Sequence, residues 1–167
     1  LIALGATCKI IGPGGVREIP VENFCVGPSR TVLDSGELLV SLHFPPPLPD
    51  SGARYIRFIP RNEMDIAVAG AGVSVVLENG LVKSARIALS SVGPTPLFVK
   101  EAGDALVGKP PSNENIKTAA AIARDAAKPI SDMRGTVDFR THLCEVLTRR
   151  ALDTAIERAK GGSANGH

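Results

Sequence analysis

The pattern of apolar and polar positions changes once along this chain, from strand-like runs to helix-like repeats after Pro94. Near the start, residues 6–11 and 16–19 are apolar-rich runs on either side of Gly12-Pro13-Gly14-Gly15. Glycine and proline clusters between β-rich runs are typical of turns, so this segment predicts a hairpin. Residues 37–44 are rich in Leu and Val and predict a third strand.

A second group of strands is predicted further along. Residues 54–59 form a short strand-like run, and residues 67–77 and 81–90 lie on either side of Asn79-Gly80. Asn-Gly readily adopts the positive φ angles of a tight hairpin turn. The sequence therefore predicts a long antiparallel hairpin in this region.

Three helices are predicted after the strands. Leu97, Ala102, Leu106 and Val107 indicate a short helix that ends at Gly108. A second helix is expected to begin at Ser112, a residue type that can accept from the first free amides, and to run to about residue 127. The third runs from about residue 138 to Gly161 because apolar residues recur at helical spacing: Phe139, Leu143, Val146, Leu147, Ala151, Ala155 and Ile156.

An antiparallel sheet followed by helices in one block predicts an α+β fold in which about three helices cover one face of the sheet. Residues 46–52 contain three prolines and are expected to form a linker, since proline cannot donate to a β-ladder. The predicted division is residues 1–45, a linker at 46–52, residues 53–161 and a flexible tail at 162–167. The start at Leu1 without a methionine predicts a cut product.

Composition restricts the possible function. The formal net charge is only +2 and no dense Lys/Arg run occurs, which argues against nucleic-acid binding. No run reaches the roughly 20 apolar residues of a membrane span. Three cysteines without a C-x-x-C pair favour reduced thiols, and so a cytoplasmic protein, over a disulfide framework.

No local motif supplies chemistry by itself. Gly70-Ala71-Gly72 lacks the third glycine and the following helix of a dinucleotide fingerprint, and is expected to be a packed strand. The three histidines lack Cys or carboxylate neighbours at metal-ligand spacing, so no metal site is predicted. Glu63 and Asp65 could act as paired carboxylates, but a corner held by Arg61 is the favoured interpretation. No catalytic residue is assigned.

Several segments, in order along nearly the whole chain, resemble the FAD-binding medium subunit of the molybdenum hydroxylase family, of the carbon monoxide dehydrogenase and xanthine dehydrogenase type. The matching segments are FCVGPSRTVL at 24–33, GELLVSLHFP at 36–45, RYIRFIPRNEMDIA at 54–67, GPTP at 93–96, DMRGTVDFR at 132–140 and LTRRAL at 147–152.

The resemblance implies a CO dehydrogenase flavoprotein C-terminal domain at residues 53–161, preceded by a remnant of the FAD-binding domain at residues 1–45. It implies an oxidoreductase subunit in which FAD passes electrons from iron–sulfur clusters to an acceptor. The implied partners are a molybdenum-containing large subunit and an iron–sulfur small subunit. Two positions correspond to cofactor-binding residues: Leu39 against the flavin ring, and Arg57 as a cation beside it.

The glycine-rich loops that hold the FAD diphosphate in this family have no counterpart in the 167 residues. Because phosphates need a cradle of backbone amides, this chain alone is expected to bind FAD weakly and to be inactive. Two alternatives remain open: a non-catalytic subunit-docking module of the same complex, and a small-molecule binding protein with its pocket between sheet and helices.

Overall fold

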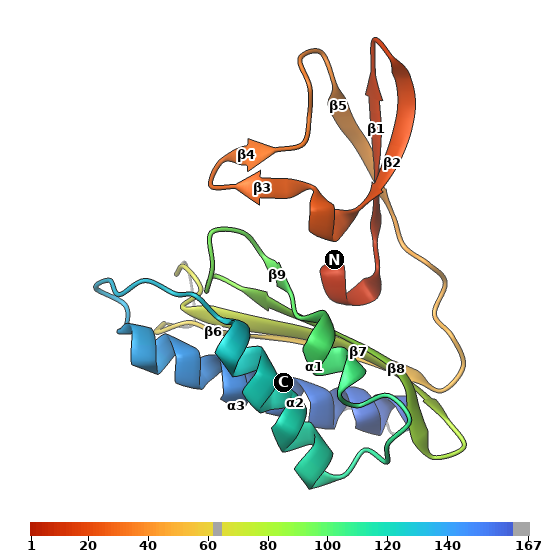
Figure 1. The fold of residues 1–167 in the computed structure, drawn as a ribbon, viewed down its shortest axis with the longest axis vertical. Helices are drawn as coiled ribbons and strands as arrows, with labels where there is room; N and C mark the ends of the chain where they lie inside the picture. The colour runs from red at the N-terminus through yellow and green to blue at the C-terminus, as the bar shows by residue number, and fades with distance from the viewer. Residues whose placement is uncertain (62–64, 162–167) are drawn as a thin grey trace.

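Two main antiparallel sheets and a two-stranded sheet of β3 and β4 organise the described residues (Figure 1). The structure is a computed structural model that describes residues 1–61 and 65–161. The smaller main sheet has the strand order β2-β1-β5, and the larger has the order β6-β7-β8-β9. The predicted tail at 162–167, with His167, and Glu63 of the predicted corner lie outside the described residues.

The first 43 residues form a small β-rich unit. β1 pairs antiparallel with β2, with Gly12 opposite Gly15, which confirms the first predicted hairpin. β5 pairs with the other side of β1 and confirms the third predicted strand. The elements are η1 (Ile2–Leu4), β1 (Thr7–Gly12), β2 (Gly15–Pro20), η2 (Val21–Asn23), β3 (Cys25–Gly27), β4 (Arg30–Thr31) and β5 (Leu38–His43).

Residues 44–50 connect this unit to the larger sheet without regular secondary structure. The sheet contains β6 (Ser51–Phe58), β7 (Ala69–Glu78), β8 (Leu81–Ser90) and β9 (Leu97–Phe98). Ser51 and Gly52, which the sequence assigned to the linker, therefore belong to β6. Asn79 and Gly80 have φ angles of 53° and 78°, which confirms the predicted β7–β8 turn.

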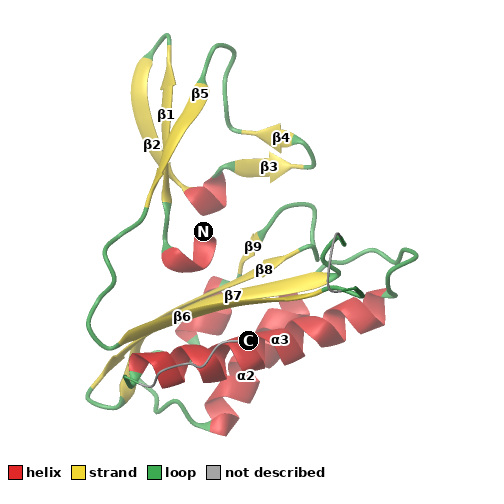
Figure 2. Ribbon diagram, turned by 180° about the vertical axis from the view of Figure 1, so that it is seen from behind, coloured by secondary structure: helices red, strands yellow, loops and turns green. Residues whose placement is uncertain are grey.

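Three helices lie on one face of the larger sheet, as the sequence predicted; the first and third pack on its strands, and the second packs on these two helices (Figure 2). They are α1 (Lys100–Asp104), α2 (Asn113–Ala126) and α3 (Val137–Ala159). The Ser112 hydroxyl accepts from the Asn115 amide at 3.3 Å, as a helix N-cap does. Among the helices that the structure describes, none combines the length and apolar character needed to cross a membrane.

The first helix is shorter than the sequence predicted. Leu97 is not helical but pairs with Leu89 as part of β9, and α1 begins only at Lys100. In α1, the backbone at Gly103 lies so close to the sheet that a Cβ there would collide with the carbonyl oxygen of Ala85. Tertiary pairing with β8 therefore overrides the helical spacing of Leu97.

The main core lies between β7 and α3. Alternate residues of β7 point toward the helices and are buried, as the period of two along a strand requires: Ala69, Ala71, Val73, Val75 and Leu77. The predicted apolar face of α3 is largely buried, but Phe139 is 41% exposed. Arg140, Cys144, Thr148, Leu152 and Ala159 are buried on α3 although they were not predicted to be.

Candidate functional site

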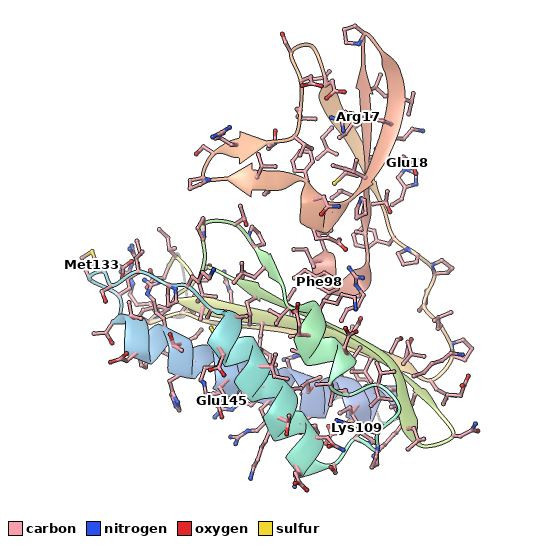
Figure 3. The ribbon with its side chains drawn as sticks, in the orientation of Figure 1. Arg17, Glu18, Phe98, Lys109, Met133 and Glu145 are labelled. Carbon is pink, nitrogen blue, oxygen red and sulfur yellow. The ribbon has the colours of Figure 1, made fainter. Side chains whose placement is uncertain are left out.

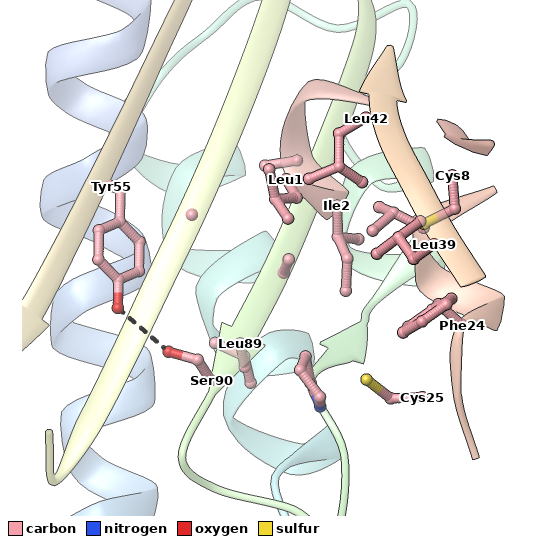
Figure 4. A pocket seen from close by; sticks show the side chains of 15 residues that line it. Leu1, Ile2, Cys8, Phe24, Cys25, Leu39, Leu42, Tyr55, Leu89 and Ser90 are labelled. Atoms are coloured by element: carbon pink, nitrogen blue, oxygen red, sulfur yellow. Dashed lines mark hydrogen bonds between the residues drawn. The ribbon is translucent and has the colours of Figure 1, made fainter. Parts of the chain in front are cut away.

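A cavity of about 400 Å³ lies between the small β-rich unit and the face of the larger sheet that the helices leave free (Figure 4). Its size falls in the range of small-molecule pockets. The lining is mostly apolar and comes from both units: Leu1, Ile2, Ala3, Cys8, Val21, Phe24, Cys25, Leu39, Leu42, Tyr55, Gly72, Ala88, Leu89, Ser90 and Pro96.

Arg86 fixes the small unit over the sheet. Its Nη2 atom lies 2.8 Å from Glu22 Oε1, and its Nε donates to the Ile2 carbonyl at 3.0 Å. The guanidinium carbon also lies 4.2 Å from the centre of the Phe98 ring. These contacts join η1, η2 and β9, so they determine how the cavity is closed.

Leu39 lies in the wall of this cavity that β5 provides. It pairs with Ile10 of β1, next to a register shift at Lys9/Ile10. Leu39 is 39% exposed on this edge strand, which leaves its apolar surface available to a ligand. The structure therefore places this predicted residue in the cavity.

Arg57 lies on the same face of the larger sheet but outside the cavity lining. It sits opposite Gly70 in the β6–β7 ladder, two residues after Tyr55, which does line the cavity. Residues two apart on a strand point to the same side. Arg57 is exposed, and within the described residues it makes no ion pair.

Two hydroxyl groups form a polar spot on the cavity floor. Tyr55 Oη lies 3.4 Å from Ser90 Oγ, as Figure 4 shows. Gly70 lies beneath the pair, where a Cβ would collide with Ser90 Oγ and lie 2.8 Å from Tyr55 Oη. Sequence reasoning did not assign Tyr55 or Ser90 to a site. The only signal available in the sequence was the alternation of sides along the predicted strands that contain Tyr55, Arg57, Gly70 and Ser90.

The two buried thiols are not activated nucleophiles. Burial raises the pKa of the Cys8 thiol, with smaller contributions from Cys25 and Glu22. Burial also raises the pKa of Cys144 in α3 to about 11. All three cysteines are free, and only Cys25 is exposed. Protonated thiols are poor nucleophiles, so Cys8 and Cys144 are not supported in this role.

The predicted corner near Asp65 is held by two arginines. Asp65 Oδ2 lies 3.5 Å from Arg61 Nε, and Asp65 Oδ1 lies 3.6 Å from Arg134 Nε. In the described ranges, no group of three or more His, Cys, Asp or Glu side chains could hold a metal ion. Gly70-Ala71-Gly72 lies within β7, as the packed-strand interpretation predicted.

Comparison with known proteins identifies the two units. Residues 54–155 match the family model described as the CO dehydrogenase flavoprotein C-terminal domain. The chain belongs to the CO dehydrogenase flavoprotein family. Residues 1–47 match a second model, described as the FAD binding domain in molybdopterin dehydrogenase. The resemblance found in the sequence is thereby confirmed.

The chain spans about half the length of the curated relatives of this flavoprotein family that it matches. It is 35% identical over 157 residues to the carbon monoxide dehydrogenase medium chain of Afipia carboxidovorans, covering 94% of this chain and 54% of the relative. It is 29% identical over 157 residues to a putative xanthine dehydrogenase FAD-binding subunit of Escherichia coli, with 93% and 54% coverage.

Solved structures in the flavoprotein family share the fold. Carbon monoxide dehydrogenase from Hydrogenophaga pseudoflava matches with a TM-score of 0.90 and 33% identity, over 94% of this chain and 54% of that chain. Reconstituted CO dehydrogenase from Oligotropha carboxidovorans matches with a TM-score of 0.88 and 34% identity, over 93% and 54%. The predicted α+β fold is therefore confirmed.

Proposed function

We propose that the protein to which this chain belongs is the FAD-carrying electron-transfer subunit of a molybdenum hydroxylase-type oxidoreductase. The observation that carries the proposal is the apolar cavity at the junction of the two matched domains, lined by Leu39 and bordered by the face that bears Arg57. The division into residues 1–45, 46–52, 53–161 and 162–167 is part of this proposal, with the last two residues of the 46–52 linker lying in β6.

The cavity fits the ring part of a flavin. Its volume of about 400 Å³ and its mostly apolar lining suit a planar aromatic system, and the hydroxyls of Tyr55 and Ser90 offer hydrogen bonds to a polar ring edge. A diphosphate cradle requires backbone amides in a glycine-rich turn before a helix. Gly12-Pro13-Gly14-Gly15 instead joins two strands, so this chain alone should hold the dinucleotide weakly.

Three residues of the cavity lining, and Arg57 outside it, have distinct roles in the proposal. When bound, the flavin supplies the capacity to accept and pass on electrons. Leu39 packs against the ring and excludes water from it. Tyr55 and Ser90 orient the ring through their hydroxyls. Arg57 places a positive charge on the same side of the sheet, which favours negative charge on a reduced ring.

The partners in this proposal are a molybdenum-containing large subunit and an iron–sulfur small subunit. The support is that the relatives are named as a medium chain and as an FAD-binding subunit, words that describe parts of larger assemblies. The proposed location is the cytoplasm, consistent with three free cysteines. In isolation, this chain is proposed to be inactive because it has no assigned catalytic residue.

The proposal is tested with Arg57→Glu in the full-length subunit. The charge reversal should lower the midpoint potential of the bound flavin or reduce the FAD retained per subunit, because a positive charge near the ring is replaced by a negative one. Lys117→Glu is the matched control, since Lys117 is exposed on α2, which lies on the opposite face of the sheet. Unchanged potential and flavin content in Arg57→Glu would remove Arg57 from the site.

A second experiment separates the alternatives. Purified full-length subunit is examined for flavin absorbance, and the 167-residue chain is titrated with FAD and riboflavin. A yellow subunit supports the cofactor role. A colourless full-length subunit that still joins its partners supports the docking-module alternative. A colourless monomer that binds other small apolar ligands supports the alternative of a small-molecule binding protein.

A further inference from the structure

Exposed apolar side chains gather at one corner of the molecule, at the loop that leads into α3. Met133 is 93% exposed, Ile130 is 74% exposed and Ile66 is 65% exposed. We call these three residues and the turn 132–135 the Met133 corner. Figure 3 shows Met133 at the outer end of this loop. Ile66 and Ile130 line one hollow, and exposed apolar groups that lie together on a folded protein are typical of interaction sites.

The turn that presents Met133 is held in place by its own hydrogen bonds. Asp132 and Gly135 exchange two backbone hydrogen bonds, at 3.1 and 3.2 Å. The Asp132 carboxylate also accepts from the Arg134 amide at 2.8 Å. The hydrogen bond from the Arg134 amide, and then the bond from Arg140, hold the pKa of the Asp132 carboxyl below its usual range. The carboxylate therefore stays charged. A backbone turn that is already ordered loses little further conformational freedom on binding.

Arg140 connects this turn to the sheet. Its side chain is almost fully buried, and its Nη2 lies 2.6 Å from Asp132 Oδ1. Its Nη1 donates to the carbonyl oxygens of Val68 at 3.0 Å and Ser91 at 3.4 Å. One guanidinium therefore fixes the turn against the start of β7 and the end of β8, so the Met133 corner is a rigid surface.

A hollow of about 460 Å³ is lined by Asp132 and Arg134, the residues on either side of Met133 in the turn, and gives the corner its charge. Ile66 and Ile130 line it, together with three cationic residues, Lys128, Arg134 and Arg140, and one acidic residue, Asp132. The charged lining is therefore net positive by two, from three positive and one negative group. Arg140 pairs with Asp132, and Arg134 pairs with Asp65, which leaves Lys128 to attract an anionic partner group.

We propose that the Met133 corner is a docking surface for a partner protein subunit that presents an apolar pocket with aspartate or glutamate side chains at its rim. Met133 enters the apolar pocket, and the acidic side chains lie against Lys128. This inference rests on the proposed function, since the partner is another subunit of the same complex. Apolar anchors surrounded by complementary charges are the usual arrangement of a specific interface.

The test uses the full-length subunit together with its partner subunits. Met133→Asp and Lys128→Glu are introduced separately, and the dissociation constant of the complex is measured by sedimentation. Each change should weaken assembly about tenfold or more, as the loss of a central interface contact does. Lys128→Glu should also reduce the dependence of assembly on salt concentration, because it removes an attractive charge.

Val107→Asp and Lys117→Glu are matched controls, because both residues are exposed and lie away from this corner. Both should assemble like the wild type. The flavin absorbance of every variant is measured before mixing. If Met133→Asp and Lys128→Glu assemble with wild-type affinity, the docking proposal is overturned. If the wild-type subunit carries no flavin but assembly still depends on Met133, the proposed function fails and the docking surface stands.

Discussion

Arg86 Nη2 lies 2.8 Å from Glu22 Oε1, and this ion pair joins the two halves of the chain at the edge of the cavity. Both side chains are partly buried, at 33% and 18% exposure. Solvent therefore screens the attraction between these two charges less than it screens the attraction in a surface pair. Arg86 also donates a hydrogen bond to the Ile2 carbonyl, so replacing Arg86 also removes a contact that holds η1 in place.

Arg86→Met should lower the free energy of unfolding by about 2 kcal/mol, because hydrogen bonds to charged groups are lost and Glu22 is left without its partner. Urea unfolding followed by circular dichroism measures this value. The control is Lys83→Met, which removes the Lys83–Glu78 pair, where both side chains are more than half exposed. That change should cost less than about 1 kcal/mol. Equal losses in the two variants would contradict the bridging role of Arg86.

Gly52→Ala should be strongly destabilising. A Cβ at Gly52 would collide with the backbone carbonyl of Ala155 in α3 and lie 2.8 Å from the Ala159 amide nitrogen. Neither backbone atom can move without shifting the helix, so the cost should be about 3 kcal/mol or more. Gly14→Ala is the control, because nothing lies within 4 Å of its added Cβ. Thermal unfolding of the two variants compares them, and a neutral Gly52→Ala would show that α3 does not pack against β6 this closely.

Glu37 contributes an acid-sensitive part of the stability. Hydrogen bonds from Arg17, and then from the Asp34 amide, lower the pKa of Glu37 to about 2. The folded pKa lies below that of an unfolded glutamate, about 4.3, so the stabilisation is complete above that value. It is lost as the pH falls toward 2. The stability difference between the wild type and Glu37→Gln should therefore shrink between about pH 5 and pH 2. A difference independent of pH in this window would contradict the ion pair.

Thiol reactivity should report on the cavity. Only Cys25 is exposed and it lines the cavity, whereas Cys8 and Cys144 are buried. Titration with a colorimetric disulfide reagent should modify one thiol in the native chain and all three after unfolding. In the flavin-loaded full-length subunit, Cys25 should react more slowly, because the ring covers it. Rapid reaction of Cys8 in the native chain would mean that the two units separate readily.

Tyr55→Phe should change the environment of a bound flavin without changing the fold. The substitution removes the hydroxyl that lies 3.4 Å from Ser90 Oγ but keeps the ring. In the full-length subunit, we expect a shift in the flavin absorption maxima and a weaker affinity of about threefold to tenfold, the effect of one modest hydrogen bond. His142→Ala is the control, since His142 is exposed on α3. Identical spectra for Tyr55→Phe would place the ring away from the cavity floor.

Local sequence signals predicted most of the larger sheet and two of the three helices. The Asn79-Gly80 turn and the Ser112 cap depend on neighbouring residues, so they can be read from the sequence. Leu97 was misassigned because its state depends on pairing with Leu89, which no local pattern encodes. The short pairing of β3 with β4 was missed because its few residues show no clear alternation.

Arg140 shows why the candidate surfaces were harder to predict than the fold. A charged residue in a helical repeat is expected to face solvent, yet Arg140 is buried. Its partners Val68, Ser91 and Asp132 lie 72, 49 and 8 residues away in sequence. Leu39 entered the site through the family resemblance alone. Tyr55 and Ser90 meet across the sheet, 35 residues apart, and only the folded chain brings them together.

The cavity has one wall in each of the two matched regions, residues 1–47 and residues 54–155. Leu39 and Cys25 come from the first region, and Tyr55 and Ser90 from the second. A hybrid protein that takes only one region from a relative would therefore join two walls that did not evolve together. For recombination between members of this family, the two regions should be transferred as a pair, with Glu22 and Arg86 kept in the same parent.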